Sequence, residues 1–284
     1  MIETIRESLA DGLRSGRIRA VRSAQTEEHD KPVKMHPTLA VLSVEREVDA
    51  FVVDDRFVNR YLTLDGNARR TQILSSLDVM DDLRGRQLIS AEDLFSHRTY
   101  LRQAGYQFVS VTVEELLHHL NNAPLKDGQV VETAELRAIR ESLLKARMSK
   151  MLQIPLETPW LQQTMQSLML CIKQLWKTKT DLAEAKSYSE WLLALLDVRG
   201  WAPSALPGNE RGFALFAHAA HVLSLMTAPE GVTDDVKDSY RNWVDERLVK
   251  DLRDTQPEAF SWIVERTREM ISEAADKAAD ALGE

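Results

Sequence analysis

The chain has 284 residues, of which 44% are hydrophobic and 28% charged, and its formal net charge is −8. This length allows one large domain or two ordinary ones, and the composition is typical of a soluble globular protein. The negative charge disfavours general coating of nucleic acid, which needs a basic surface. The single cysteine, Cys171, excludes an internal disulfide and a zinc site built from several cysteines.

No apolar run reaches the ~18 residues that a membrane-spanning helix needs, and no signal peptide is apparent. We therefore expect a cytoplasmic protein that contacts no membrane. Cys171 lies within an apolar helical segment, so we expect a buried and unreactive thiol.

The first part of the chain alternates short apolar segments with polar turns. Residues 2–13 have the spacing of an amphipathic helix. The arginine-rich residues 16–23 are interpreted as a solvated segment rather than a phosphate-binding stripe. Residues 50–53 and 71–74 predict two short strands, and the alternation in residues 107–111 predicts a third.

Helical periodicity surrounds these strands. We expect short helices at residues 38–44 and 56–62, a helix beginning near Ser76, and longer helices at 90–103 and 113–120. Ser76, Ser90 and Thr112 are expected to cap the last three of these helices. The order of strands and helices predicts an α/β fold with a small parallel sheet and flanking helices.

The second part of the chain is predicted to be all-α. Residues 121–131 contain Pro124 and the turn dipeptide Asp127-Gly128, so we place a domain boundary there, between 1–124 and 125–284. No fixed-period repeat is present, which disfavours a regular TPR or HEAT array. About six helices are expected, at residues 133–152, 160–177, 181–198, 213–226, 236–252 and 258–282.

Three carboxylates are the leading candidates for chemistry. Asp54 and Asp55 follow the strand at 50–53, and Asp78 lies in the first turn of a helix. Mg²⁺ and Mn²⁺ prefer such oxygen ligands, and two-metal phosphodiester cleavage needs several of them near one point. Asn59 would then orient a phosphate or a water. The alternative is purely structural, because acids and serines at helix starts stabilise the helix without any function.

The histidines and tryptophans are interpreted as structural. His218 and His221 share one helix face, as a metal pair requires, but apolar neighbours surround them. Adjacent His118 and His119 point about 100° apart on a helix and make a poor chelate. The six tryptophans lie at core spacings in the second half, where packing between helices is favoured over stacking on bases. Exposed apolar residues on those helices would mark a protein interface.

Three segments carry a family resemblance: AFVVDDRFVNRY, LSSLDVMDDLRGRQLIS and LRQAGYQFVSVTVEELLHHL. Together they resemble the C-terminal half of a PIN-like nuclease domain, over residues 48–120. In that fold a strand ends in an acid, a helix start rich in Thr, Ser and Leu follows, and a last strand and a closing helix come after a Gly-Leu-Ile step. That step is loosened here to residues 86–89. The resemblance is closest to PIN-like segments near the C-termini of large bacterial proteins, often followed by a helical tail.

The resemblance implies a metal-dependent ribonuclease site that uses Mg or Mn. Asp54 or Asp55 would match a late acidic position of that site, and Asp78 a neighbouring one. PIN nucleases also begin with a hydrophobic strand that ends in aspartate, and residues 1–47 contain no such strand. We therefore expect either part of a longer protein or a degenerate site.

Two main functions compete from the sequence. The first is a partial or degenerate PIN-like subunit that acts as an assembly and protein-interaction module of a bacterial system, with the helical half binding a protein partner. The second is a Mg- or Mn-dependent ribonuclease, acting on RNA, whose site is completed by a missing N-terminal segment or a partner chain. A helical regulator of bacterial defence or of a toxin system is a third hypothesis, based on family context alone.

Overall fold

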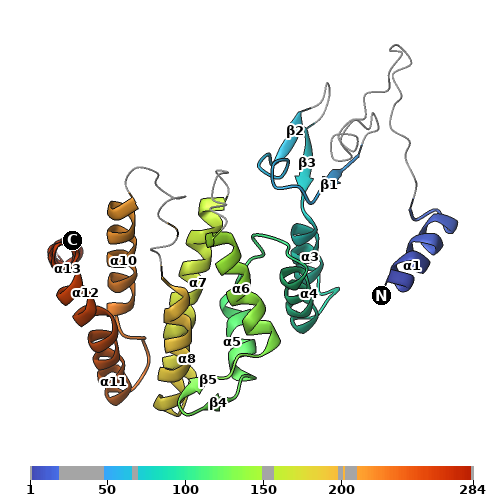
Figure 1. The fold of residues 1–284 in the computed structure, drawn as a ribbon. Helices are drawn as coiled ribbons and strands as arrows, with labels where there is room; N and C mark the ends of the chain where they lie inside the picture. The colour runs from blue at the N-terminus through green and yellow to red at the C-terminus, as the bar shows by residue number, and fades with distance from the viewer. Residues whose placement is uncertain are drawn as a thin grey trace. The chain divides into compact units, whose positions relative to one another are not determined.

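The computed structural model describes residues 2–18, 48–65, 70–148, 157–197, 201 and 210–282 (Figure 1). The chain divides into two compact units, Met1–Leu88 and Ile89–Glu284. The described residues are mostly helical, with one sheet of three strands and one of two. The expected helix at 38–44 and most of the arginine-rich stretch lie outside the described residues.

Helix α1 (Ile2–Arg14) is amphipathic, as predicted, and ends in a reversal of the chain. Gly16 has a φ of 72°, and the Ile18 backbone N–H donates to the Gly12 carbonyl at 2.9 Å. The Ile18 side chain then lies over Gly12, where an added Cβ would come too close to the Ile18 Cδ1. A larger residue at position 12 would therefore require the Ile18 side chain to move.

The first unit contains a three-stranded sheet of β1 (Ala50–Val52), β2 (Thr63–Asp65) and β3 (Arg70–Leu74), in the order β1-β3-β2. β1 is parallel to β3, with Phe51 opposite Ile73, whereas β2 is antiparallel to β3. The strands predicted at 50–53 and 71–74 are confirmed and pair in parallel, but the sheet is mixed because β2, a strand that was not predicted, is antiparallel. β2 and β3 are separated by only four residues, which is too short for the crossover that a parallel pair needs.

Helix α3 (Ser76–Gly85) follows β3 directly and begins where the sequence predicts. Its N-cap is Ser75 rather than Ser76. The Ser75 side chain accepts a hydrogen bond from the Asp78 backbone N–H, and the Asp78 side chain accepts one from the Ser75 backbone N–H. Residues 56–60 form turns rather than the expected helix.

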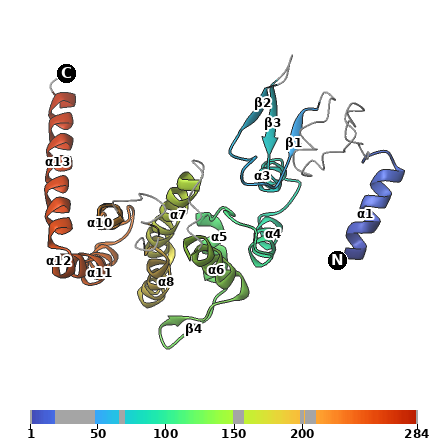
Figure 2. The same ribbon diagram turned by 45° about the horizontal axis from the view of Figure 1, so that its top comes forward.

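The second unit is helical apart from a short hairpin (Figure 2). Ser90 and Thr112 cap α4 and α5 as expected. The two units divide after Leu88, and not at the boundary expected near Pro124, because α4 packs on α6 and α5 packs on both α6 and α7. The elements are α4 (Ala91–Gln103), α5 (Val113–Asn121), β4 (Leu125–Lys126), β5 (Gln129–Val130), α6 (Ala134–Met148), α7 (Glu157–Thr178), α8 (Leu182–Leu195), α10 (Glu210–Met226), α11 (Asp234–Val244), η2 (Asp245–Val249), α12 (Lys250–Thr255) and α13 (Pro257–Leu282).

The strand predicted at 107–111 is wrong. Phe108 has a φ of 59°, which interrupts an extended backbone, and no strand is assigned there. The alternation in the sequence does correspond to alternating burial, since Val109 and Val111 are both buried. The two-stranded hairpin was not predicted, although its turn was: Asp127 and Gly128 have φ values of 52° and 73°, as a tight hairpin turn requires.

The core of the second unit is continuous from α5 to α13. Cys171 is buried within it, and burial raises the pKa of its thiol, which confirms the unreactive cysteine. Trp176 and Trp243 are also buried, where the sequence places them between helices. Among the described helices, none combines the length and the apolar character that crossing a bilayer requires. Fully buried side chains include Leu116, Leu120, Leu136, Ile139, Leu168, Ile172, Leu175, Leu192, Tyr240 and Leu252.

The helix expected at 236–252 contains a π-helical segment, η2, between α11 and α12. The Lys250 N–H donates to the Asp245 carbonyl, a bond five residues back instead of four. Glu190 of α8 holds this region, since its Oε1 accepts the Trp243 indole N–H at 2.8 Å and its Oε2 accepts an Arg247 Nη2–H at 2.7 Å.

Candidate functional site

Asp54 follows β1 and is bonded to the start of α3. Its Oδ1 accepts the Ser76 backbone N–H at 2.8 Å, and its Oδ2 accepts the Ser76 hydroxyl at 2.6 Å. Both carboxylate oxygens therefore link the end of β1 to the first turn of α3, the helix that follows the neighbouring strand β3. An acid near the positive end of a helix is also favourable electrostatically.

Asp55 and Asn59 close the turn after β1. The Asp55 Oδ1 accepts the Phe57 N–H at 2.9 Å and the Val58 N–H at 3.3 Å. The Asn59 Oδ1 accepts the Asp55 N–H at 3.0 Å. Such side-chain bonds to the local backbone compete with helix formation, which explains why turns replace the expected helix here. The amide oxygen predicted to orient a phosphate is bonded within the turn.

Asp78 completes the capping box of α3. Its Oδ2 accepts the Ser75 N–H and the Ser75 hydroxyl, both at 2.7 Å. Within the part of the chain that the structure describes, no three or more His, Cys, Asp or Glu side chains are grouped to hold a metal ion. Asp54, Asp55 and Asp78 do not form such a group, and their oxygens are engaged in separate local bonds. Their catalytic and metal-binding roles remain predictions.

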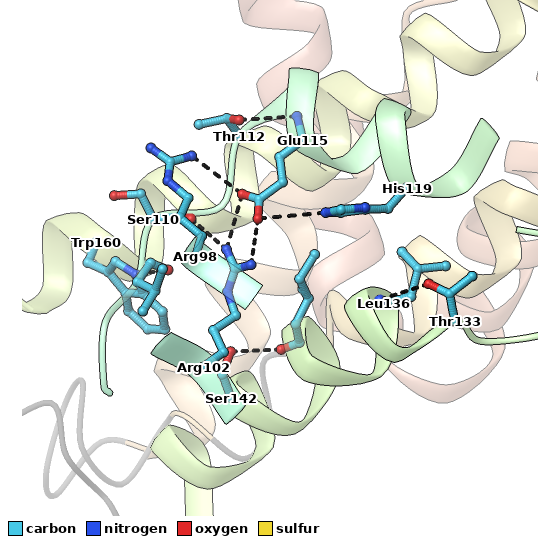
Figure 3. Close-up of polar contacts among 12 residues, drawn as sticks. Arg98, Arg102, Ser110, Thr112, Glu115, His119, Thr133, Leu136, Ser142 and Trp160 are labelled. Carbon is cyan, nitrogen blue, oxygen red and sulfur yellow. Dashed lines mark hydrogen bonds and ion pairs between the residues drawn. The ribbon is translucent and has the colours of Figure 1, made fainter. Parts of the chain in front are cut away.

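A charged cluster is buried in the second unit, where α4 meets α5 (Figure 3). Glu115 is 0% exposed and receives two bonds from Arg102, from Nη1 to Oε1 at 2.5 Å and from Nη2 to Oε2 at 3.1 Å. Arg102 Nη2 also donates to the Ser110 carbonyl at 2.7 Å, and Arg98 Nη1 donates to Glu115 Oε2 at 3.4 Å. Two guanidinium groups thus share one buried carboxylate.

His119 lies on the other side of Glu115. Its Nε2 is 4.0 Å from Glu115 Oε1, which is beyond hydrogen-bonding distance, and its side chain is almost fully buried. Burial lowers the pKa of this imidazole, and the nearby Glu115 charge opposes the shift only in part. The lowered pKa favours the neutral imidazole. The planes of the His118 and His119 rings are inclined by 78° to one another.

His119 also lines a small cavity of about 210 Å³, which we call the imidazole pocket. Its walls come from the first turns of α4 and α6 and from the last turn of α5. A hydrogen bond from Thr133 is the main reason why the pKa of Glu135 is lowered, and the neighbouring imidazoles contribute to the same shift. The lining residues are Glu92, Phe95, Ser96, His118, His119, Asn122, Thr133 and Glu135.

A larger and mostly apolar groove of about 700 Å³ lies between α5, α7 and the segment after α10, and we call it the α5–α7 groove. Leu170 lines it and is 48% exposed. Lys173 is half-buried there, and desolvation lowers the pKa of its ammonium although Glu230 acts in the opposite direction. The lining residues are Val113, Glu114, Leu117, Leu170, Lys173, Gln174, Lys177, Thr227, Ala228, Pro229 and Glu230.

The histidine pair of α10 lines a third cavity, of about 830 Å³. Burial, assisted by His218, lowers the pKa of His221 to about 4. The structural interpretation of the pair stays a prediction, because its surroundings are not only apolar. Acidic side chains line the same cavity: Asp197 just after α8, Glu246 of η2, and Asp251 and Asp254 of α12.

The buried cluster and both of the cavities beside α5 are not predicted by the sequence patterns. Arg98, Arg102 and Glu115 are charged residues at positions where the helical spacing calls for apolar ones, next to Leu94 and Leu116. A charge at a core position was the available signal, because charged groups are almost never fully buried unless they are paired.

Comparisons of the chain with protein-family models, with curated proteins and with solved structures return no match. The resemblance to PIN-like nucleases therefore rests on the residues of this chain alone.

Proposed function

We propose that the chain is a protein-interaction subunit whose helical unit binds an amphipathic helix of a partner protein in the α5–α7 groove. One observation carries the proposal: a half-exposed leucine, Leu170, lies in this groove on the same helix face as two lysines.

The spacing on α7 suits a helical ligand. Leu170, Lys173, Gln174 and Lys177 recur at intervals of three and four residues, so they form one stripe along the helix. Val113 and Leu117 supply apolar surface from α5. An apolar groove of this kind accepts the apolar face of a helix, which buries its anchors at the same spacing.

The charges of the groove favour a ligand with acids along one edge. The pKa of Lys173 is lowered because its ammonium group has lost hydration. The negative charge of Glu230 offsets this loss only in part. A carboxylate from the partner would supply the missing compensation at Lys173, and a second could form an ion pair with Lys177, which lines the same groove. Glu114 and Glu230 also line the groove, so acids on the opposite edge of the ligand would be repelled.

Two synthetic helical peptides test this proposal. Both carry a leucine stripe, with glutamates along one edge in the first and lysines at the same positions in the second. Fluorescence anisotropy should show the acidic peptide binding the full chain at least tenfold more tightly. Leu170→Asp should weaken that binding about tenfold, roughly 1.4 kcal/mol. Tyr100→Asp, which changes an exposed aromatic residue of α4, should leave it unchanged. Equal binding of both peptides, or an equal loss in both variants, would contradict the proposal.

We further propose that residues 48–88 are the remainder of a PIN-like unit, in a bacterial assembly related to defence or to a toxin system. The support is the parallel β1–β3 pair, the acids that follow β1, and the helix that follows β3. Labelled RNA incubated with the chain and Mn²⁺ separates this from the ribonuclease alternative. Cleavage that Asp54→Asn and Asp78→Asn abolish would overturn the interaction-only function, and cleavage is not expected.

A further inference from the structure

We propose that the imidazole pocket is a binding site for a small organic cation, a primary ammonium or guanidinium compound. The inference is independent of the α5–α7 groove, because the pocket is formed by α4, α5 and the start of α6.

The pocket presents acceptors and negative charge. Glu92 and Glu135 each contribute a carboxylate, and the Ser96 and Thr133 hydroxyls add further oxygens. The lowered pKa of His119 favours its neutral form, in which one ring nitrogen donates a hydrogen bond and the other accepts one. No lysine or arginine is among the described residues that line the cavity. A ligand rich in N–H donors and positively charged matches this lining.

The nearby arginines do not cancel this charge. Arg102 directs both of its terminal nitrogens at Glu115, and Arg98 donates to the same carboxylate (Figure 3). Glu115 therefore offsets one of the two positive charges, and neither arginine is among the residues that line the cavity. Glu135 instead faces the two imidazoles, whose proximity contributes to the lowering of its pKa.

Aromatic rings form another part of the wall. The Phe95 ring lies 5.3 Å from the His118 ring and 6.0 Å from the His119 ring, measured between centroids. A cation within ~6 Å of an aromatic face gains electrostatic attraction, and more so where water is excluded. Carboxylates combined with an aromatic ring thus suit an alkylammonium or guanidinium group better than a strongly hydrated inorganic ion.

Size and geometry favour an organic cation over a metal ion. A volume of about 210 Å³ corresponds to the space of roughly seven water molecules, which a short amine fills. A metal ion needs several ligands converging at about 2.0–2.6 Å, and the described side chains offer no such group of three. Hydrogen bonds of ~2.7–3.2 Å from N–H donors do not need ligands that converge so closely.

The two glutamates have a local function as well, since each lies in the first turn of its helix, where an acid is favourable. That explains the presence of either residue alone. The same function does not explain why the starts of α4 and α6 and the two imidazoles of α5 all line one cavity. Their convergence is the observation that indicates a ligand.

Calorimetric titration of the full chain at pH 7.5 tests the site with 1,4-diaminobutane and methylguanidinium as probes, and with 1,4-butanediol as the uncharged control. We expect saturable binding of at least one cation and none of the diol. Glu135→Gln should weaken binding at least tenfold. Glu141→Gln, an exposed acid farther along α6, should leave it within twofold. Ser96→Trp, which fills the cavity from α4, should abolish it.

Imidazole NMR signals give a second readout. Those of His118 and His119 should shift on adding the bound cation, and that of the exposed His97 should not. Absence of saturable binding by both cations, equal binding by Glu135→Gln and wild type, or shifts shared with His97 would each overturn the proposal. Circular dichroism establishes that each variant is folded before the titration is interpreted.

Discussion

Acidic side chains are used differently in the two compact units of this chain. In the first unit Asp54, Asp55 and Asp78 lie at chain turns and accept bonds from the nearby backbone and serines. In the second unit Glu115 is fully buried and receives two arginines. The first arrangement stabilises local turns and helix starts, whereas the second ties α4 to α5 through the core. An acid that attracts notice in a sequence is therefore not the one on which the fold depends most.

The largest expected effect is at Glu115. Replacing it with alanine leaves Arg98 and Arg102 in the core without their shared carboxylate, and breaking a buried pair in this way costs about 3–5 kcal/mol. Urea unfolding of the full chain measures the loss. Glu114→Ala, on the exposed side of the same helix, should change the free energy of unfolding by less than about 0.5 kcal/mol. Similar losses in both variants would remove the contrast between the units.

The pH dependence of stability comes next. The pKa of His221 is lowered to about 4 in the folded chain, against ~6.5 when unfolded, so between these values the unfolded state binds the extra proton. The free energy of unfolding should therefore fall as the pH decreases from 7 to 4, by up to about 3 kcal/mol from this group. Chemical unfolding at several pH values measures it. His221→Asn should flatten the dependence, and His97→Asn, an exposed position, should not. A dependence that survives His221→Asn unchanged would contradict this assignment.

Helix starts in the first unit should give a smaller effect. Ser75→Ala removes the N-cap of α3, and Asp54→Ala removes both bonds to Ser76, each at a cost of roughly 1 kcal/mol. The loss is local, so amide hydrogen exchange in α3 should accelerate while exchange in α7 stays the same. Accelerated exchange in α7 would mean that these caps stabilise more than their own unit.

The smallest effect is expected at the exposed pair of Asp82 and Arg86, which are 2.9 Å apart on α3. Surface pairs of this kind contribute about 0–0.5 kcal/mol on a helix. Asp82→Ala should therefore leave hydrogen exchange in α3 nearly unchanged, and it is the matched control for Ser75→Ala. If Asp82→Ala accelerated hydrogen exchange in α3 as much as Ser75→Ala does, the surface ion pair would stabilise this helix as much as its N-cap does.

Local signals were sufficient for much of the fold. Ser90 and Thr112 are predicted as caps because their hydroxyls act on the adjacent residues, and the structure confirms both. The strand at β3 follows from a short apolar run. The strand at 107–111 fails because alternation reports burial and not hydrogen bonding: Val109 and Val111 are buried, but Phe108 turns the backbone.

The candidate sites could not be read in the same way. The bonds from Arg102 to Glu115 span thirteen residues, and they depend on the angle at which α4 meets α5. Similarly, the imidazole pocket exists because Glu135 of α6 comes to face His119 of α5. No residue spacing in the sequence predicts these contacts between different helices.

The strand-end acids were visible because they directly follow an apolar run. Asp55 and Asp78 also have partners within four residues along the chain, whereas Asp54 bonds to Ser76 at the start of α3.

The π-helical segment at residues 245–249 has a consequence for the length of the chain. A π turn holds one residue more than an α turn, so it shifts the phase of everything after it by about 100°. Leu252 is fully buried with that shift in place. Losing one residue here would restore regular helical bonding and yet turn α12 away from its contacts with α13. A substitution in this segment is limited by the contacts of the one side chain that it changes. An insertion or deletion is limited by the packing of α12 and α13, which follow the segment.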